Sequence, residues 1–199
     1  IPEEMRAQLQ LSLVRSHAAG TGPEVEEEVI RALMLLRLST LCTGRTGVRP
    51  VVVETYAKAL NAGIVPVVRE YGSLGCSGDL APLAHCALAL LGEGEVRVNG
   101  ELQDAGDALA AAGIEPLQLR EKEGLALING TDGMLGQLCL AITDLRAAAK
   151  TADIATAMTV EGLLGTLVVF ADDLQQLRPH PGQADAAANI LQVAEGSEI

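Results

Sequence analysis

The chain has 199 residues, 49% of them hydrophobic, which excludes a disordered chain and allows one domain with a substantial core. Its formal net charge of −12 argues against nucleic acid or an anionic membrane as the main partner, because both require basic patches. Aromatic residues make up only 2%, so the core must rest on aliphatic side chains, and the many alanines and leucines favour helices.

The cysteines, at positions 42, 76, 86 and 139, form no CxxC pair, so a structural zinc site is not expected. Nothing in the sequence is typical of a secretory signal, and no apolar run is expected to reach membrane-spanning length. The chain is therefore predicted to work in a reducing cytoplasm without contact to a membrane.

The first part of the chain predicts helices joined by short loops. Residues 1–14 carry apolar side chains at helical spacing, and residues 16–22 are expected to form a loop of small residues around His17. A second helix is predicted from Pro23 to Gly44, with glutamates crowded at its positive end as a solvated face rather than a metal site. A third helix is expected from Pro50 to about Leu60.

Residues 72–85 read Gly-Ser-Leu-Gly-Cys-Ser-Gly-Asp-Leu-Ala-Pro-Leu-Ala-His, a glycine-rich loop that runs directly into an apolar helix predicted over about 79–91. Gly75 and Gly78 can adopt backbone conformations closed to other residues, and Asp79 is a good residue to begin a helix. The sequence therefore predicts a tightly bent loop delivered onto a rigid helix.

The second half of the chain combines one hairpin with further helices. Residues 95–102 predict a β-hairpin around an Asn-Gly pair, and a short alanine-rich helix follows. Asn129 comes after an apolar run and before a glycine, at the start of a long helix expected over 131–150. Another helix is expected over 152–169. By itself, an Asn-Gly pair such as the one at Asn129 is usually a turn.

Four segments resemble the signatures of the aromatic amino-acid ammonia-lyases. They are residues 16–22 (SHAAGTG), 72–85, 127–131 (LINGT) and 177–183 (LRPHPGQ). In these enzymes an Ala-Ser-Gly triad forms a 4-methylidene-imidazol-5-one, and here Cys76 stands in place of the alanine. Its side chain would hang off the ring and take no part in closure, so this departure is expected to be tolerated.

The resemblance implies that Cys76, Ser77 and Gly78 cyclise autocatalytically into this cofactor. Attack of the Gly78 nitrogen on the Cys76 carbonyl carbon closes a five-membered ring, and one water leaves. A second water leaves from Ser77 and gives an exocyclic methylidene. That group is a strong electrophile, which ordinary side chains do not provide. No metal or nucleotide is expected beside it.

The resemblance also implies the other site residues and the substrate. His17 would orient the substrate, and Asn129 would contact the cofactor or substrate, where an amide donor stabilises developing charge. Asp79 and Leu80 are expected to support the cofactor loop, Asp79 by capping the following helix. The Ser16-His17 pair favours members that act on L-histidine, which lose ammonia to give trans-urocanate in the first step of histidine degradation.

The implied fold is mainly α, with a small β-hairpin, the cofactor loop at a helix N-terminus and the start of a long helical bundle. Residues from 1 to about 125 would be the cofactor-bearing part, and those from about 126 to 199 the start of the bundle. The family is a homotetramer whose active sites combine several subunits. The catalytic base of the family and its other substrate contacts match no part of residues 1–199. The chain is therefore expected to be an internal fragment, and the sequence does not predict whether this fragment is active by itself.

Several alternatives stay open. The nearest is a lyase or aminomutase that uses the same cofactor on phenylalanine or tyrosine. A phosphate-binding loop fits less well, because the glycines are spaced G-x-x-G-x-x-G and no lysine follows. A serine or cysteine hydrolase is disfavoured because Asp79 replaces the second glycine of a nucleophile elbow. The remaining alternative is a non-catalytic helical interaction fragment. His17 alone would suit a linker between helices, and His85 and His180 are expected to have structural roles whichever alternative holds.

Overall fold

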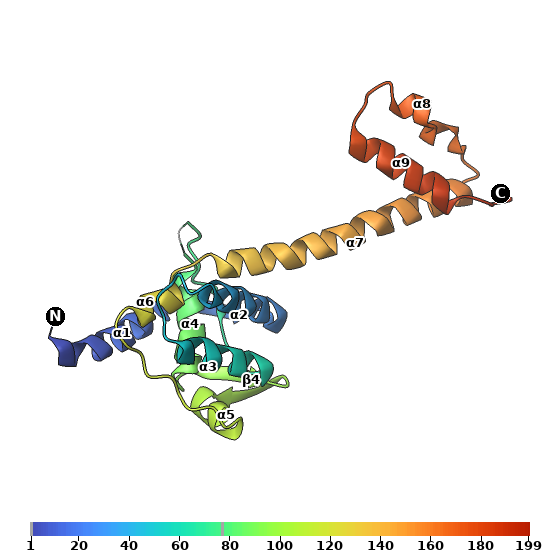
Figure 1. Cartoon of the computed structure of the whole chain (residues 1–199). Helices are drawn as coiled ribbons and strands as arrows, with labels where there is room; N and C mark the ends of the chain where they lie inside the picture. The colour runs from blue at the N-terminus through green and yellow to red at the C-terminus, as the bar shows by residue number, and fades with distance from the viewer. Residues whose placement is uncertain (1, 77) are drawn as a thin grey trace. The chain divides into compact units, whose positions relative to one another are not determined.

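The computed structural model describes residues 2–76 and 78–199 (Figure 1). Internal contacts divide the chain into two compact units, one up to Leu140 and one from Ala141, and the boundary falls inside helix α7. The elements are α1 (Glu3–His17), β1 (Thr21–Glu24), α2 (Glu27–Cys42), α3 (Pro50–Asn61), β2 (Val65–Pro66), β3 (Arg69–Tyr71), α4 (Leu80–Leu90), β4 (Glu95–Val98), β5 (Glu101–Asp104), α5 (Ala105–Ala111), α6 (Glu123–Ile128), α7 (Asp132–Gly162), the 3₁₀ helix η1 (Leu167–Phe170), α8 (Asp172–Gln175) and α9 (Pro181–Val193). The mainly helical fold is confirmed, whereas the expected division near residue 125 stays a prediction.

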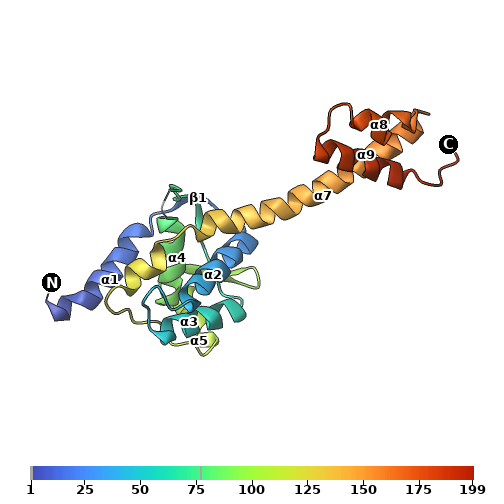
Figure 2. The ribbon, with the colours of Figure 1, turned by 45° about the horizontal axis from the view of Figure 1, so that its top comes forward.

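Helix α4 lies at the centre of the first unit. Its sequence is apolar on nearly every side, and eight of its 11 residues are buried. It packs against α1, α3, α5 and α6 (Figure 2). Full burial of one leucine such as Leu83 contributes about 1.5–3 kcal/mol, so this helix is a firm support for the loop at its N-terminus.

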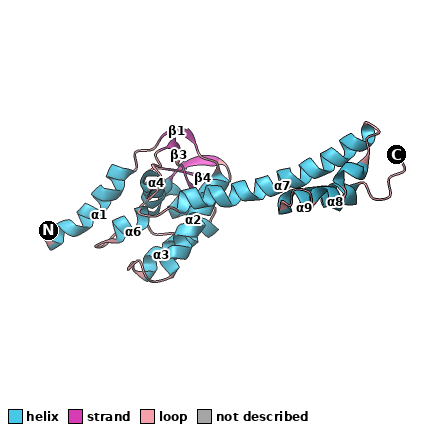
Figure 3. Cartoon of the chain, turned by 90° about the horizontal axis from the view of Figure 1, so that it is seen from above, coloured by secondary structure: helices cyan, strands magenta, loops and turns pink. Residues whose placement is uncertain are grey.

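Two small antiparallel sheets complete the first unit (Figure 3). Strand β1 pairs with β3, with Thr21 opposite Tyr71, and the second sheet has the order β2-β4-β5. The predicted hairpin is confirmed as β4 and β5: Asn99 and Gly100 have φ values of 53° and 83°, as a type I′ turn requires. The β1–β3 pair sets the segment after His17 beside the beginning of the glycine-rich loop.

Two predicted helix boundaries in the first part of the chain are wrong. Helix α1 continues through His17, so the loop expected from residue 16 begins after the helix. The second helix does not open at Pro23, which lies in β1. The N–H of Val25 donates to the Val68 carbonyl at 2.9 Å, and this pairing keeps the segment extended until α2 begins at Glu27.

The two helices expected over 131–150 and 152–169 are one helix, α7, which ends at Gly162. No glycine or proline lies between residues 137 and 161, so nothing in the sequence interrupts its hydrogen bonding. The expectation about membrane-spanning length is corrected too. The helical stretch 123–162 is long and apolar enough to cross a membrane by length and composition alone, a test that core helices of soluble proteins also pass.

The second unit consists of the end of α7 with η1, α8 and α9. Its small core contains Ala157, Ala187 and Ile190, which are buried between these helices. Asn189 Nδ2 donates a hydrogen bond to Asp153 Oδ2 at 2.8 Å and ties α9 to α7. The described residues that the sequence singles out as a site all lie in the first unit.

Candidate active site at the glycine-rich loop

The glycine-rich loop is bent as the sequence predicts. Gly75 has a φ of 63° and Cys76 a φ of 62°, so two successive residues adopt the left-handed conformation. This conformation is unfavourable for a side-chain-bearing residue such as cysteine, and it is typical of strained functional segments. The Gly78 N–H reaches back to the Gly75 carbonyl at 3.4 Å. Ser77 lies outside the described residues, so its role in the cofactor stays a prediction.

Gly78 is buried against the turn that joins α6 to α7. A Cβ on Gly78 would lie 3.3 Å from Asn129 Nδ2 and 3.4 Å from the backbone N and O of Gly130. The Asp79 N–H donates to the Gly130 carbonyl at 2.6 Å. The structure therefore brings Gly78 and Asn129 together, although 51 positions separate them in the chain (129 − 78).

Asp79 does not cap its own helix, contrary to prediction, because no side-chain hydrogen bond closes the start of α4. Its buried carboxylate accepts from Ser73 Oγ at 2.5 Å and from the Met134 N–H, in the first turn of α7, at 3.0 Å. Asp79 thus caps α7 across the turn. The N–H groups of Gly78 and Asp79 donate to the carbonyls of Gly75 and Gly130, so they are not free donors at the start of α4. Leu80 is half-buried and packs on the hydrophobic core.

His17 ends helix α1 and is half-buried. Its Nδ1 lies 2.8 Å from the Leu13 carbonyl and 3.0 Å from Ser16 Oγ. With the proton on Nδ1 donated to Leu13, the neutral form of the ring carries its lone pair on Nε2. Among the described residues no hydrogen bond joins His17 to Gly78 or Asn129, so the structure does not by itself place His17 with them.

His85 connects the segment after His17 to helix α4. Its Nε2 accepts a hydrogen bond from the Gly20 N–H at 3.1 Å. Burial, and to a smaller degree the charge of Arg69, lowers the pKa of His85, so the ring is neutral and can accept this bond. A Cβ on Gly72 would lie only 3.1 Å from Gly20 Cα, which shows how closely the two loops approach. The predicted structural role of His85 is confirmed.

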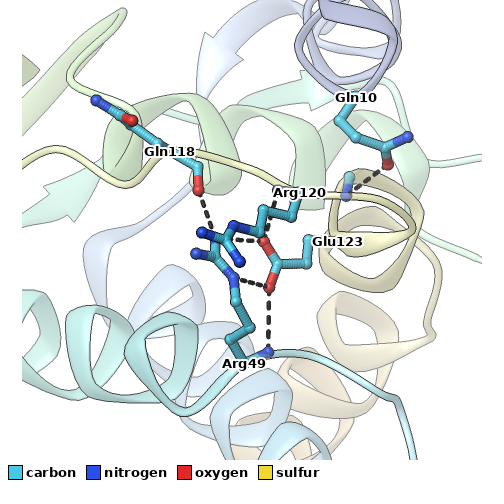
Figure 4. A network of polar contacts seen from close by, with 6 residues as sticks. Gln10, Arg49, Gln118, Arg120 and Glu123 are labelled. Atoms are coloured by element: carbon cyan, nitrogen blue, oxygen red, sulfur yellow. Dashed lines mark hydrogen bonds and ion pairs between the residues drawn. The ribbon is translucent and has the colours of Figure 1, made fainter. Parts of the chain in front are cut away.

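Glu123 holds the beginning of α6, the helix that leads into Asn129. Its buried carboxylate accepts from the backbone N–H of Arg49 and Arg120 and from the Arg49 guanidinium, at 2.8–3.1 Å (Figure 4). Burial acts to raise the pKa of Glu123, but the bonds from Arg49 and Arg120 prevail and lower it. Gln10 Oε1 accepts from the Gly124 N–H at 3.1 Å, so α1 and the residue that precedes α3 both fix this helix.

Arg37 is the other polar residue that sequence reasoning missed. It is 4% exposed, and its guanidinium faces the turn that contains Asn129. A signal was present: Arg37 falls on the buried stripe of α2, in line with Leu33, Met34 and Leu41. A charged residue at a core position needs buried partners, so the stripe could have pointed to it.

A small cavity borders the described part of the loop. A space of about 50 Å³ lies behind it, lined by Ser73, Asp79 and Met134 among others, whereas sites for small molecules usually measure about 300–1,000 Å³. Asn129 is exposed to solvent. Larger cavities are present among other described residues, for example one of about 390 Å³ beside Arg49 and Lys58.

Comparison with known proteins decides the family. All residues from 1 to 199 match the family model described as aromatic amino acid lyase. The chain belongs to the aromatic amino acid lyase family. The predicted resemblance is thus confirmed over the whole sequence.

Relatives within the aromatic amino acid lyases include enzymes of more than one activity. The chain is 63% identical to histidine ammonia-lyase of Streptomyces avermitilis, over 100% of this chain and 39% of that protein. Histidine ammonia-lyase of Trypanosoma cruzi has a crystal structure that matches with a TM-score of 0.90 at 41% identity, over 96% of this chain and 38% of that one. Tyrosine aminomutase of Streptomyces globisporus matches with a TM-score of 0.91 at 44% identity, over 99% and 37%. The chain therefore spans about two fifths of the length of these relatives.

Proposed function

We propose that the protein containing this chain is a histidine ammonia-lyase, which eliminates ammonia from L-histidine to give trans-urocanate. The observation that carries the proposal is the contact of Gly78, in the strained loop, with the side-chain amide of Asn129. The 63% identity to a histidine ammonia-lyase supports histidine as the substrate.

The residues present fit a 4-methylidene-imidazol-5-one made from Cys76, Ser77 and Gly78. The left-handed Gly75 and Cys76 bend the backbone sharply before Gly78, whose missing Cβ would lie 3.3 Å from Asn129 Nδ2. The group would supply an electron-poor carbon that converts the α-amino group of the substrate into a leaving group. Asn129, at its edge, would donate a hydrogen bond to the oxygen that gains negative charge.

His17 would orient the substrate imidazole. Its bond from Nδ1 to the Leu13 carbonyl fixes the ring and presents Nε2 as an acceptor for a substrate N–H. Gly20, held by His85, keeps the following segment against the glycine-rich loop. Together with the Ser16-His17 pair, this arrangement favours histidine over phenylalanine or tyrosine.

The parts of the protein outside residues 1–199 would complete the site. The small cavity at the loop and the exposed Asn129 support this, because a substrate needs more enclosure than they provide. We propose that the catalytic base and further substrate contacts come from those parts and from other subunits of a homotetramer. We also propose that the enzyme works in the cytoplasm and uses no metal or nucleotide.

An enzyme that acts on tyrosine or phenylalanine is the second candidate. It is favoured by the 44% identity to a tyrosine aminomutase, which is close to the 41% identity to the Trypanosoma cruzi histidine enzyme. A non-catalytic helical interaction fragment is the candidate from another class, and it predicts no product from any of these amino acids.

The test uses the full-length protein. L-histidine, L-tyrosine and L-phenylalanine are offered separately, and urocanate, coumarate and cinnamate are followed by absorbance. We expect urocanate to form from histidine. We expect the intact mass of the protein to be lower by two waters, with this loss located in a peptide containing residues 76–78. Ser77→Ala should lose nearly all activity. Wild-type turnover by Ser77→Ala would refute the mechanism, and coumarate or cinnamate as the main product would refute the substrate.

A further inference from the structure

Arg37 carries a buried positive charge close to the proposed site. The side chain comes from α2 and is 4% exposed. A buried charge is costly unless it is paired and hydrogen-bonded, and removal of one partner from such a group is strongly destabilising. The partners of Arg37 therefore indicate what the residue does.

The contacts of Arg37 converge on the turn between α6 and α7. Nη1 donates to the Asn129 carbonyl at 2.8 Å and to the Ala126 carbonyl at 3.3 Å. Nη2 lies 3.2 Å from Asp132 Oδ2. The two carbonyls are at the C-terminal end of α6, where a cation is favoured, and Asp132 begins α7, where an anion is favoured. Arg37 thus joins the end of one helix to the start of the next.

Asp79, the residue that follows the loop triad, also holds this turn. Asp79 donates its N–H to the Gly130 carbonyl and accepts from the Met134 N–H through its carboxylate. A Cβ on Gly130 would lie 2.8 Å from Arg37 Nη2, so the guanidinium is pressed directly on the backbone. Small errors in this turn would therefore move the Asn129 side chain relative to Gly78.

We propose that Arg37 is a positioning residue for the lyase reaction, which fixes the Asn129 backbone so that its amide lies against the cofactor loop. The inference rests on the proposed function, in which Asn129 contacts the cofactor. Arg37 itself touches none of the loop triad residues that the structure describes. Lysine is a poor replacement, because one compact ammonium cannot reproduce the planar fork that reaches two carbonyls and a carboxylate.

The test is a double-mutant cycle in the full-length enzyme. Arg37→Lys, Asn129→Ala and the combination are compared for kcat and KM with L-histidine, and Arg31→Lys, at an exposed position of the same helix, is the matched control. A misplacement of about 1 Å costs about 100-fold, so we expect Arg37→Lys to lower kcat by about 10- to 100-fold with a smaller change in KM. In the Asn129→Ala background the same change should lower kcat by less than about threefold. The control should resemble wild type.

A purely structural role would give a different result. In that case Arg37→Lys would lower kcat by the same factor in both backgrounds, or leave it unchanged, and either result overturns the proposal. The intact mass of Arg37→Lys should still be lower by two waters, as expected for the wild-type enzyme. If the variant does not lose these two waters, its defect is in ring closure, and the proposal that Arg37 positions Asn129 is overturned. If Arg37→Lys does not fold, Asp132→Asn takes its place in the cycle. We expect it to lower kcat by a smaller factor than Arg37→Lys, and again to have little effect on kcat in the Asn129→Ala background. Wild-type enzyme without urocanate formation would instead refute the proposed function.

Discussion

Replacement of Glu123 by glutamine tests how firmly helix α6 is held. The carboxylate accepts four hydrogen bonds, three from Arg49 and one from Arg120. Glutamine has a single acceptor oxygen, because an NH₂ group replaces the other carboxylate oxygen. The N–H groups that donate to that oxygen in the wild type would lose their acceptor and face the NH₂ group. Loss of hydrogen bonds at a buried group costs about 1–3 kcal/mol each. We expect local opening of α6 to become easier by about 3 kcal/mol, or about 100-fold in the opening equilibrium.

Hydrogen–deuterium exchange of the amides of residues 123–128 in the full-length protein measures this opening. Glu121→Gln, two residues away in an exposed position, is the matched control. Because the folded state lowers the pKa of Glu123 from its ordinary value of 4.5, its stabilisation is complete above that value and is lost as pH falls through the folded-state pKa. The difference between wild type and Glu123→Gln should therefore shrink in acid. Wild-type exchange of α6 in Glu123→Gln at neutral pH would refute the reasoning.

Three further predictions concern single side chains. Among the described residues the buried Tyr56 hydroxyl has no hydrogen-bond partner, so Tyr56→Phe should leave the melting temperature unchanged or raise it, and a clear decrease would contradict this. Burial raises the pKa of Cys86 to about 12, so a maleimide at pH 8 should label exposed Cys42 but not Cys86, as peptide mapping would show. The folded state lowers the pKa of His85 from 6.5, and only the neutral ring can accept the hydrogen bond from the Gly20 N–H. Protection of the Gly20 amide against hydrogen exchange, corrected for the intrinsic rate, should therefore be full above pH 6.5 and decrease below it. Protection that does not change with pH would contradict this.

Local signals in the sequence predict local structure well in this protein. Helix α3 begins at Pro50 and the hairpin turns at Asn99-Gly100, because each of these choices depends only on neighbouring residues. Pro23 misleads for the same reason. It suits a helix start, but a hydrogen bond from Val25 to the distant Val68 keeps it in a strand.

The site shows the same division. Motif resemblance identifies Gly78 and Asn129, and the fold brings them into contact. The sequence could not show that Asp79 caps α7 rather than α4, because its partner Met134 lies 55 residues further along. Arg37 could be noticed in the sequence as a charged residue on the apolar stripe of α2. The carbonyls that it contacts belong to the backbone, so the sequence could not identify them.

The distance in sequence between Asp79 and Met134 has a consequence for the order of events during synthesis. The chain is made from its N-terminus, so the glycine-rich loop leaves the ribosome well before the turn that presses on it. Until residues 129–134 have emerged and α6 has docked, the loop lacks the contacts from Asn129, Gly130 and Met134. Any self-modification that depends on the packed loop is thus delayed until this region has folded. A reactive electrophile would then arise only after residues 129–134 have packed on the loop, and not in the extended chain that has just left the ribosome.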